Sequence, residues 1–330
     1  MFLPLARSLR RAGLIWRMKL VAAGLAALAT AAGGSRCAAE ESLWRSLLDE
    51  GLEVAPGTAV RLEPPLVADG MTAAEQTAAI RGLVGDDWER FVKPGVTARF
   101  EFRITKACDL PAGGSVQRLD LWFIGHGSLA TVEDGGLIDD LLATRPAAEG
   151  EAAEPAKPAE PAEEGENRRQ SRSRELSADE LRERNLTAAA AADGGEVSYA
   201  LVDLALINKV RVTGICRGVR MKTPESLTAA VRLDERFLDD PTLPARWFPL
   251  LRDEADGVLR EGRPQPYAVA AAYAKATRLA EPAGAMLVEV HVVFAEPQGW
   301  FDGRNLLRTK LPPLLQQSVQ SFRRKLRAER

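Results

Sequence analysis

The sequence predicts an α+β fold in which a curved antiparallel sheet of about six to eight strands packs against a long C-terminal helix. Three observations lead to this prediction. Segments in which apolar and polar residues alternate recur along the chain, as expected for strands with one buried face. Turn-forming residues separate several of them by short distances, which favours antiparallel pairing. The segment after Pro312-Pro313 has no helix breaker, and its apolar residues follow helical spacing.

Residues 1–39 have the order of regions that is typical of a secretory signal peptide. A basic start precedes an unbroken run of apolar and small residues at 20–32, and small residues precede a cleavage site before Glu40. The apolar run is shorter than the roughly 20 residues that cross a bilayer. We therefore expect export to the periplasm or the medium, with no integral membrane segment after cleavage. Met18 is an alternative start codon, because it would begin a compact signal.

Charge and cysteine usage narrow the function class. Removing the six positive charges of the signal from a chain with a formal net charge of −2 leaves about −8, whereas nucleic-acid binding requires a basic surface.

Cys108 and Cys216 remain after cleavage, and export makes a disulfide between them chemically possible. Two small buried apolar side chains are the alternative. Two cysteines without clustered histidines do not make a zinc site, and we expect no metal and no cofactor.

The N-terminal half of the mature chain contains predicted helices and strands in turn. One strand is expected within 54–66, followed by helices at 72–84 and 86–92. Apolar and polar residues then alternate over 97–106 and again over 116–124. The turn-rich residues between these two segments predict an antiparallel hairpin.

Residues 146–175 differ in composition from the sequence around them. They are rich in Pro, Ala and Glu and then in Arg, with almost no large apolar residues. Ordering such a segment costs conformational entropy without apolar burial to offset it. We therefore predict one domain, 40–330, interrupted by a disordered insertion. The insertion is either a contact arm for a protein partner or a tolerated loop.

The C-terminal half is predicted to supply most of the sheet. A capping box at 177–180 begins a helix that we expect to reach about Ala191, and a short helix is expected around 248–259. Residues 267–279 fit either helix or strand, and the turn chemistry that follows them favours strand. The predicted strands are 197–207, 210–221, 227–233, 267–279 and 286–295.

The final helix is predicted from Pro312 to about Arg327. Its apolar stripe consists of Leu315, Val319, Phe322 and Leu326. Basic residues load its C-terminal end, where they favour the negative pole of the helix dipole. The helix either docks its stripe on the sheet or contacts a membrane surface or protein partner.

This order of elements resembles the helix-grip fold of START and Bet v 1-like proteins over about 54–328. The resemblance implies a pocket for a lipid or other apolar small molecule between the sheet and the last helix. Trp300 and Phe301 lie between glycines after the last predicted strand, where they would gate the pocket. Leu315, Val319 and Phe322 would line it.

Two further functions compete with binding of an apolar ligand. A hydrolase could use His126 as a base for Ser128 in the Gly-His-Gly-Ser loop, or it could use His291 together with Glu289 on one strand face. A cell-envelope interaction module would instead use residues 146–175 or the C-terminal helix. We expect an exported soluble binding or structural protein, with these two as alternatives.

Overall fold

The computed structural model describes residues 43–134, 136–138, 173–186, 195–253, 257–301 and 306–328. All of them belong to the unit Glu40–Arg330. The predicted signal at 1–39 and nearly all of the predicted insertion at 146–175 lie outside the described residues. Among the helices in the described ranges, none has the length and apolarity needed to span a bilayer.

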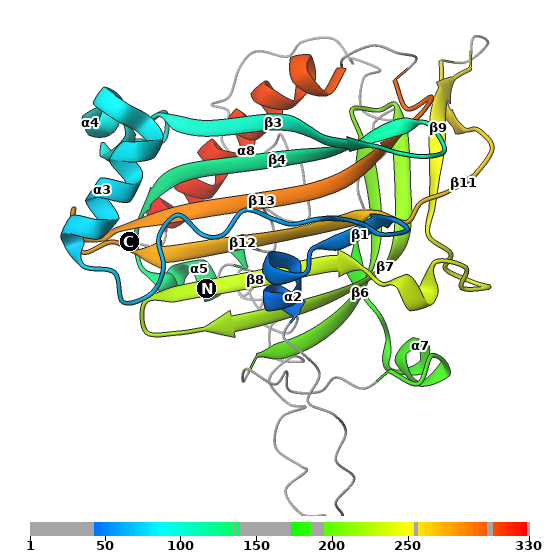
Figure 1. The fold of residues 1–330 in the computed structure, drawn as a ribbon, viewed down its shortest axis with the longest axis horizontal. Helices are drawn as coiled ribbons and strands as arrows, with labels where there is room; N and C mark the ends of the chain where they lie inside the picture. Colours follow the sequence, from blue (N-terminus) through cyan, green and yellow to red (C-terminus); the bar gives the residue numbers. More distant parts are fainter. Residues whose placement is uncertain are drawn as a thin grey trace, which may run out of the picture. The chain divides into compact units, whose positions relative to one another are not determined.

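The described residues form an α+β fold around an antiparallel sheet (Figure 1). The central strand order is β3 (Phe100–Asp109), β4 (Gly114–His126), β13 (Ala285–Pro297), β12 (Ala270–Arg278), β8 (Ser226–Leu233) and β7 (Val210–Lys222). The other strands are β5 (Arg174–Glu175), β6 (Glu196–Leu206), β9 (Arg246–Arg252), β10 (Leu259–Glu261) and β11 (Gln265–Pro266). Alternation therefore predicted the α+β class and the hairpin of β3 and β4 correctly.

The sheet is larger than predicted, because eleven described strands join it, and it is not strongly curled. The excess consists of β5, β9, β10 and β11, which the sequence did not predict: β5 pairs with β6, β9 with β7, and β10 and β11 with β9. One edge of β7 pairs with β6, and the other edge pairs first with β9 and then with β8. The helix predicted around 248–259 was wrong, because this region contributes β9 and β10 instead. Cross-strand pairing with β7 and burial of Trp247 and Leu250 outweigh local helix propensity there.

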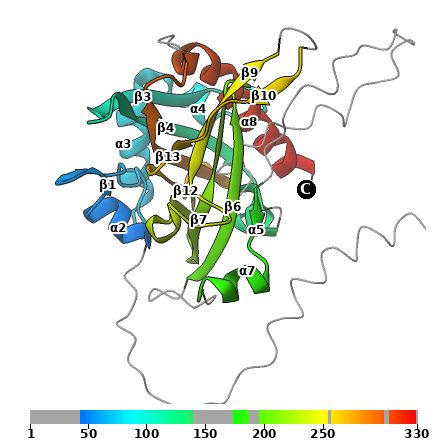
Figure 2. The same ribbon diagram turned by 90° about the vertical axis from the view of Figure 1, so that its right-hand side faces the viewer.

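The N-terminal elements cover one face of the sheet (Figure 2). They are α2 (Leu43–Asp49), β1 (Leu52–Ala55), β2 (Thr58–Val60), α3 (Ala73–Val84), a 3₁₀ turn (Gly85–Asp87) and α4 (Trp88–Val92). The single strand predicted within 54–66 is instead the separate β1–β2 hairpin followed by an extended segment, because Gly57 turns the chain at positive φ. We call residues 61–71 the strap, since they cross the sheet between β2 and α3 (Figure 1).

The opposite face carries α5 (Leu129–Asp134) and α8 (Leu306–Ala328). Helix α8 begins before the predicted start at Pro312, so that both prolines lie inside it. Each proline removes a backbone donor, while burial of Leu307 anchors the turn that precedes them. Helix α7 (Ala178–Glu183) starts at the predicted capping box of Ser177 but ends well before Ala191.

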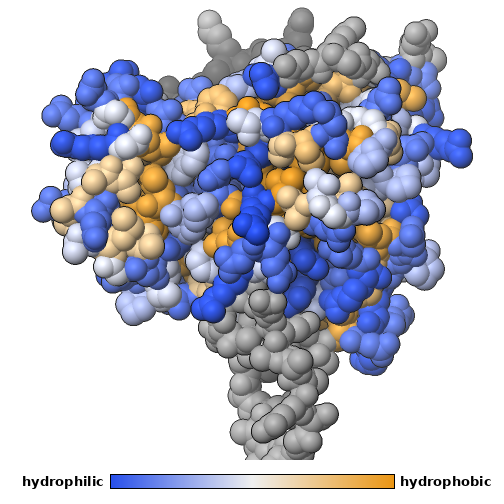
Figure 3. Space-filling model, in the orientation of Figure 1, coloured by the Kyte–Doolittle hydropathy of each residue, from blue (hydrophilic) through white to orange (hydrophobic). Residues whose placement is uncertain are grey.

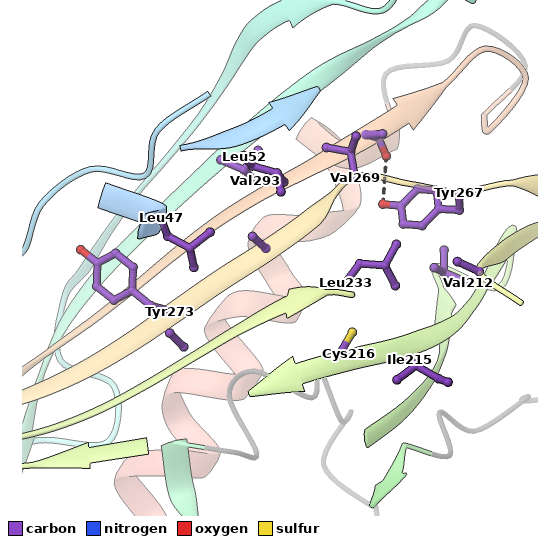
Figure 4. Close-up of a cluster of buried hydrophobic side chains, with 14 of the residues drawn as sticks. Leu47, Leu52, Val212, Ile215, Cys216, Leu233, Tyr267, Val269, Tyr273 and Val293 are labelled. Carbon is purple, nitrogen blue, oxygen red and sulfur yellow. Dashed lines mark hydrogen bonds between the residues drawn. The ribbon is translucent and has the colours of Figure 1, made fainter. Parts of the chain in front are cut away.

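Apolar clusters fill both faces of the sheet. In Figure 4, Leu47 and Leu52 lie over Tyr273 and Val293, and the Tyr267 hydroxyl donates to the Ala295 carbonyl. On the other face, Val319, Phe322 and Leu326 of α8 pack against strands β4, β12 and β13. The predicted docking of the apolar stripe of the last helix on the sheet is therefore correct. Around α3 and α4, partly exposed apolar side chains gather at the left of the molecule (Figure 3).

Candidate functional site

His126 and Ser128 occupy separate hydrogen-bonding arrangements. The Nε2 atom of His126 lies 3.1 Å from the carbonyl oxygen of Val92, on α4. The Ser128 hydroxyl accepts from the Thr131 amide at 3.1 Å and lies 3.0 Å from the Thr131 hydroxyl. Ser128 thus caps the start of α5, a position that small hydroxyl residues favour.

Glu289 and His291 of β13 are fully buried on the face that the strap covers. The Nδ1 atom of His291 lies 2.7 Å from Oδ1 of Asp120 on β4, the strand paired with β13. Its Nε2 atom lies 3.8 Å from Oε2 of Glu289, which is an electrostatic contact rather than a hydrogen bond. The His291 ring also stacks on Tyr273 and meets the edge of Trp122. The sequence identified the pair, and the structure adds Asp120 to it.

The strap uses these buried polar groups as its attachment points. Glu289 accepts from the Leu66 amide at 2.7 Å, from the Val67 amide at 3.4 Å and from Nε1 of Trp122 at 3.2 Å. Nearby, the ammonium of the buried Lys275 donates to the Val67 carbonyl at 3.2 Å and lies 2.8 Å from a carboxylate oxygen of Asp69. We call the set Asp120, Trp122, Tyr273, Lys275, Glu289 and His291 the latch.

The ionisation of His291 in the latch and of Asp69 in the strap follows from burial and from these contacts. Burial of His291 lowers its pKa, but contacts with Asp120 and Glu289 outweigh burial, so that the net pKa is raised. Burial raises the pKa of Asp69, yet hydrogen bonds from Lys275, Thr223 and Ser226 outweigh it and the net pKa is lowered. The strap amides and Trp122 occupy the carboxyl group of Glu289, so a substrate could reach Glu289 only after the strap moved. The geometry therefore assigns the latch to holding the strap.

The structure does not bring the five predicted pocket residues together. Trp300 and Phe301 are buried in the cluster that contains Tyr267 and Trp247, and the Trp300 ring stacks on Tyr267. Leu315, Val319 and Phe322 belong to the separate cluster under α8. In that second cluster the packing is close: the Phe322 and Phe123 ring centroids are 5.1 Å apart, and a Cβ on Gly125 would lie 2.9 Å from a Leu326 methyl group.

Cys108 and Cys216 are free thiols rather than partners in a disulfide. Cys216 is buried in the core, and burial raises its pKa to about 12. Cys108 on β3 is half-buried and packs against the same cluster. The two cysteines therefore behave as small apolar side chains, which was one of the two expectations from the sequence. In the described ranges, no group of three or more His, Cys, Asp or Glu side chains could hold a metal.

A hollow of about 230 Å³ lies over β6, β7 and β9, where the 242–244 loop forms one wall. Its apolar lining consists of Leu201, Leu243, Pro244 and Phe248. Threonine hydroxyls and paired charged side chains complete the lining. The hollow is open to solvent on one side, unlike the latch. Convergence of apolar and oriented polar groups in a concave surface is typical of a recognition site.

The wall of the hollow is held in place by a buried ion pair. Asp240 accepts from the amides of Thr242 and Leu243 at 2.9 and 2.7 Å. The same carboxylate binds the Arg184 guanidinium through two contacts of 2.8 and 2.9 Å, and both side chains are almost fully buried. Burial raises the pKa of Asp240, but these hydrogen bonds outweigh it and hold the net pKa well below its usual range. The 242–244 loop is therefore preorganised.

The charged groups around the hollow are paired with one another. The Arg211 guanidinium binds both carboxylate oxygens of Asp203 at 2.7 and 2.9 Å, and it lies 5.6 Å from the Phe248 ring centroid. Arg211 also binds Glu261 at 2.8 Å, and Arg246 binds Asp239 at 2.9 Å. Because each guanidinium already has a carboxylate, the hollow offers little net charge to a ligand.

Sequence reasoning missed this hollow. Its walls come from strands β6, β7 and β9, and no local spacing reports the pairing of Arg211 with Phe248 across β7 and β9. One local signal was available, because an aspartate two residues before a threonine is typical of the turn that Asp240 forms with Thr242.

Because the comparisons with known proteins find no match, the assignment of function rests on the geometry of the site. No family model matches the chain. A search of curated proteins by sequence also finds no match.

Proposed function

We propose that this chain is an exported recognition module that holds one apolar side chain of a partner protein in the hollow over β6, β7 and β9. The observation that carries the proposal is the hollow itself, an open concavity of about 230 Å³ with a preorganised wall. Partner side chains that fill such pockets supply much of the energy of protein–protein binding. Export is proposed from the sequence of residues 1–39.

The size of the hollow supports a side-chain anchor rather than a whole lipid. Small-molecule sites typically have volumes of about 300–1,000 Å³, which exceed this one. An aromatic or large aliphatic side chain would contact Phe248, Leu243 and Pro244. Thr213 also lines the hollow, whereas the Thr242 hydroxyl is already bound to Asp240 and Arg184. The paired guanidinium groups favour a neutral anchor over an acidic one, because an anion would have to compete with Asp203 and Asp239.

A lipid between the sheet and the last helix is supported less well. Such a ligand would have to displace Phe322 from Phe123 and Leu326 from the space above Gly125. Separating these buried side chains costs roughly 1.5–3 kcal/mol for each one that is exposed. The helix-grip resemblance stays a prediction.

The proposal is tested by titrating the protein with N-acetyl-tryptophanamide, N-acetyl-leucinamide and N-acetyl-aspartate amide in solution NMR. We expect saturable binding of the first two compounds and none of the third. Leu243→Asp should abolish binding, because it places a charge in the apolar wall. Leu251→Asp is the matched control, since Leu251 is 58% exposed on the same strand as Phe248 but outside the hollow. Equal binding by both variants would contradict the proposal.

A further inference from the structure

We propose that two copies of this chain associate through strand β3, which pairs antiparallel with itself about a two-fold axis at Phe102. Among the described strands, β3 pairs only with β4, so its other side is an edge of the sheet. An unpaired edge presents a row of backbone donors and acceptors to another strand. The occupant of this edge is a second copy of the chain, and the argument rests on the complementarity of the strand with itself.

The open part of the edge is short and well defined. On its N-terminal side, the Arg323 guanidinium of α8 binds the carbonyl oxygens of Val96, Ala98 and Arg99. On its C-terminal side, the register with β4 shifts at a bulge between Lys106 and Cys108. Both features block strand addition. The regular stretch Phe100–Ile104 lies between them.

Charges on this stretch are complementary in one register. With Phe102 opposite its own copy, Glu101 of each chain, one carboxylate oxygen of which binds Arg99 of the same chain, lies opposite Arg103 of the other, which gives two opposite-charge pairs. Arg103 is exposed, its guanidinium lies 5.2 Å from the Trp122 ring centroid, and the described residues offer it no carboxylate partner. A register shifted by two residues would place Arg103 opposite Arg103. Opposite charges directly across a strand pair stabilise it, and like charges destabilise it.

The apolar side of the same stretch supports the same register. Phe100, Phe102 and Ile104 point toward the α8 face and are only half-buried there. With Phe102 on the axis, Phe100 of one copy lies opposite Ile104 of the other. Leu314 of α8 is 40% exposed and lies one helical turn from Leu311, which packs beside these residues. Because the axis is perpendicular to the sheet, both α8 helices lie on the same face. There, Leu314 of each copy covers the apolar side chains of β3.

The association leaves the hollow free. Strands β3 and β9 lie toward opposite ends of the strand order, so failure of one proposal does not imply failure of the other. Pairing of five residues with one helix contact buries less than the roughly 1,200 Å² of a standard stable interface. We therefore expect a dimer that dissociates on dilution into the low micromolar range.

Sedimentation velocity over a concentration series of the mature chain tests the inference. Wild type should pass from monomer to dimer. Glu101→Arg and Arg103→Glu should each weaken the dimer at least about tenfold, because each places like charges opposite one another twice. An equimolar mixture of the two variants should form a heterodimer, since both pairs become opposite in charge again. The double variant Glu101→Arg/Arg103→Glu should form a homodimer like wild type.

The mixture and the double variant separate a lost interface from a lost fold. Lys106→Glu is the matched control, because it makes the same charge change on β3 outside the paired stretch, and it should leave the dimer intact. Circular dichroism establishes that each single variant is folded. A wild type that stays monomeric, a dimer that both single variants retain, or a mixture that stays monomeric would each overturn the inference.

Discussion

Replacing Glu289 by alanine should destabilise the protein far more than removing any exposed contact of the strap. Glu289 is fully buried, and three N–H groups donate to its carboxyl group. Alanine leaves the amide of Leu66 and the indole of Trp122 without their acceptor in an interior that holds few alternatives. It also removes the negative charge beside His291.

The magnitude follows from the number and length of these contacts. An unsatisfied buried donor costs roughly 1–3 kcal/mol, and two of the three bonds have ordinary lengths of 2.7 and 3.2 Å. The contact with the Val67 amide is longer, at 3.4 Å, and adds little. We expect a loss of about 3–5 kcal/mol in the free energy of unfolding, which agrees with the cost of breaking other buried charge pairs. A typical domain has only about 5–15 kcal/mol in total.

Urea unfolding followed by circular dichroism measures this loss, and hydrogen exchange at the Leu66 amide locates it. Glu225→Ala is the matched control, because Glu225 also accepts from a strap amide, that of Gly70 at 2.6 Å, but is exposed. The control should lose no more than about 0.5 kcal/mol. If Glu289→Ala cost as little as Glu225→Ala, the assignment of the latch as the attachment of the strap would be refuted.

Three further predictions concern the histidines, α8 and the N-terminus. The pKa of His291 is raised in the folded state, so the contribution of His291 to stability is complete below roughly pH 6.5 and is lost as the pH rises through the folded pKa. His291→Gln should remove this pH dependence in urea unfolding, and the control His126→Gln should keep it. Arg323→Met should lower the free energy of unfolding by about 2–4 kcal/mol, because the guanidinium binds four backbone carbonyls. The control Arg324→Met, at an exposed residue, should change it by no more than about 0.5 kcal/mol. Thermal unfolding compares the two variants. Intact-mass analysis of the exported protein should give a chain that begins at Glu40, and a mass that includes residues 1–39 would contradict the signal-peptide prediction.

Strand periodicity predicted most of the sheet, because apolar and polar residues alternate along a strand that has one buried face. Residues 267–279 show the limit of this signal. Their alanines favour a helix, but β12 forms because β8 and β13 pair with both of its edges. The same tertiary pairing overrode the helix expected around 248–259. The local sequence of a segment does not show which distant strands will pair with it.

The candidate sites depended even more on contacts between distant residues. The spacing of Glu289 and His291 placed both on one strand face, as the structure confirms. Asp120 and the strap amides are well over 100 residues away in sequence, so the burial of the pair could not be predicted. The hollow likewise needs β6, β7 and β9 together with the turn that Asp240 fixes.

Mapping of N-acetyl-tryptophanamide on the backbone amide NMR spectrum tests the proposed recognition site most directly. We predict that chemical-shift changes concentrate at Thr213, Leu243 and Phe248, which line the hollow. Changes centred on Val319 and Phe322 would instead place the ligand between the sheet and α8 and would contradict the account.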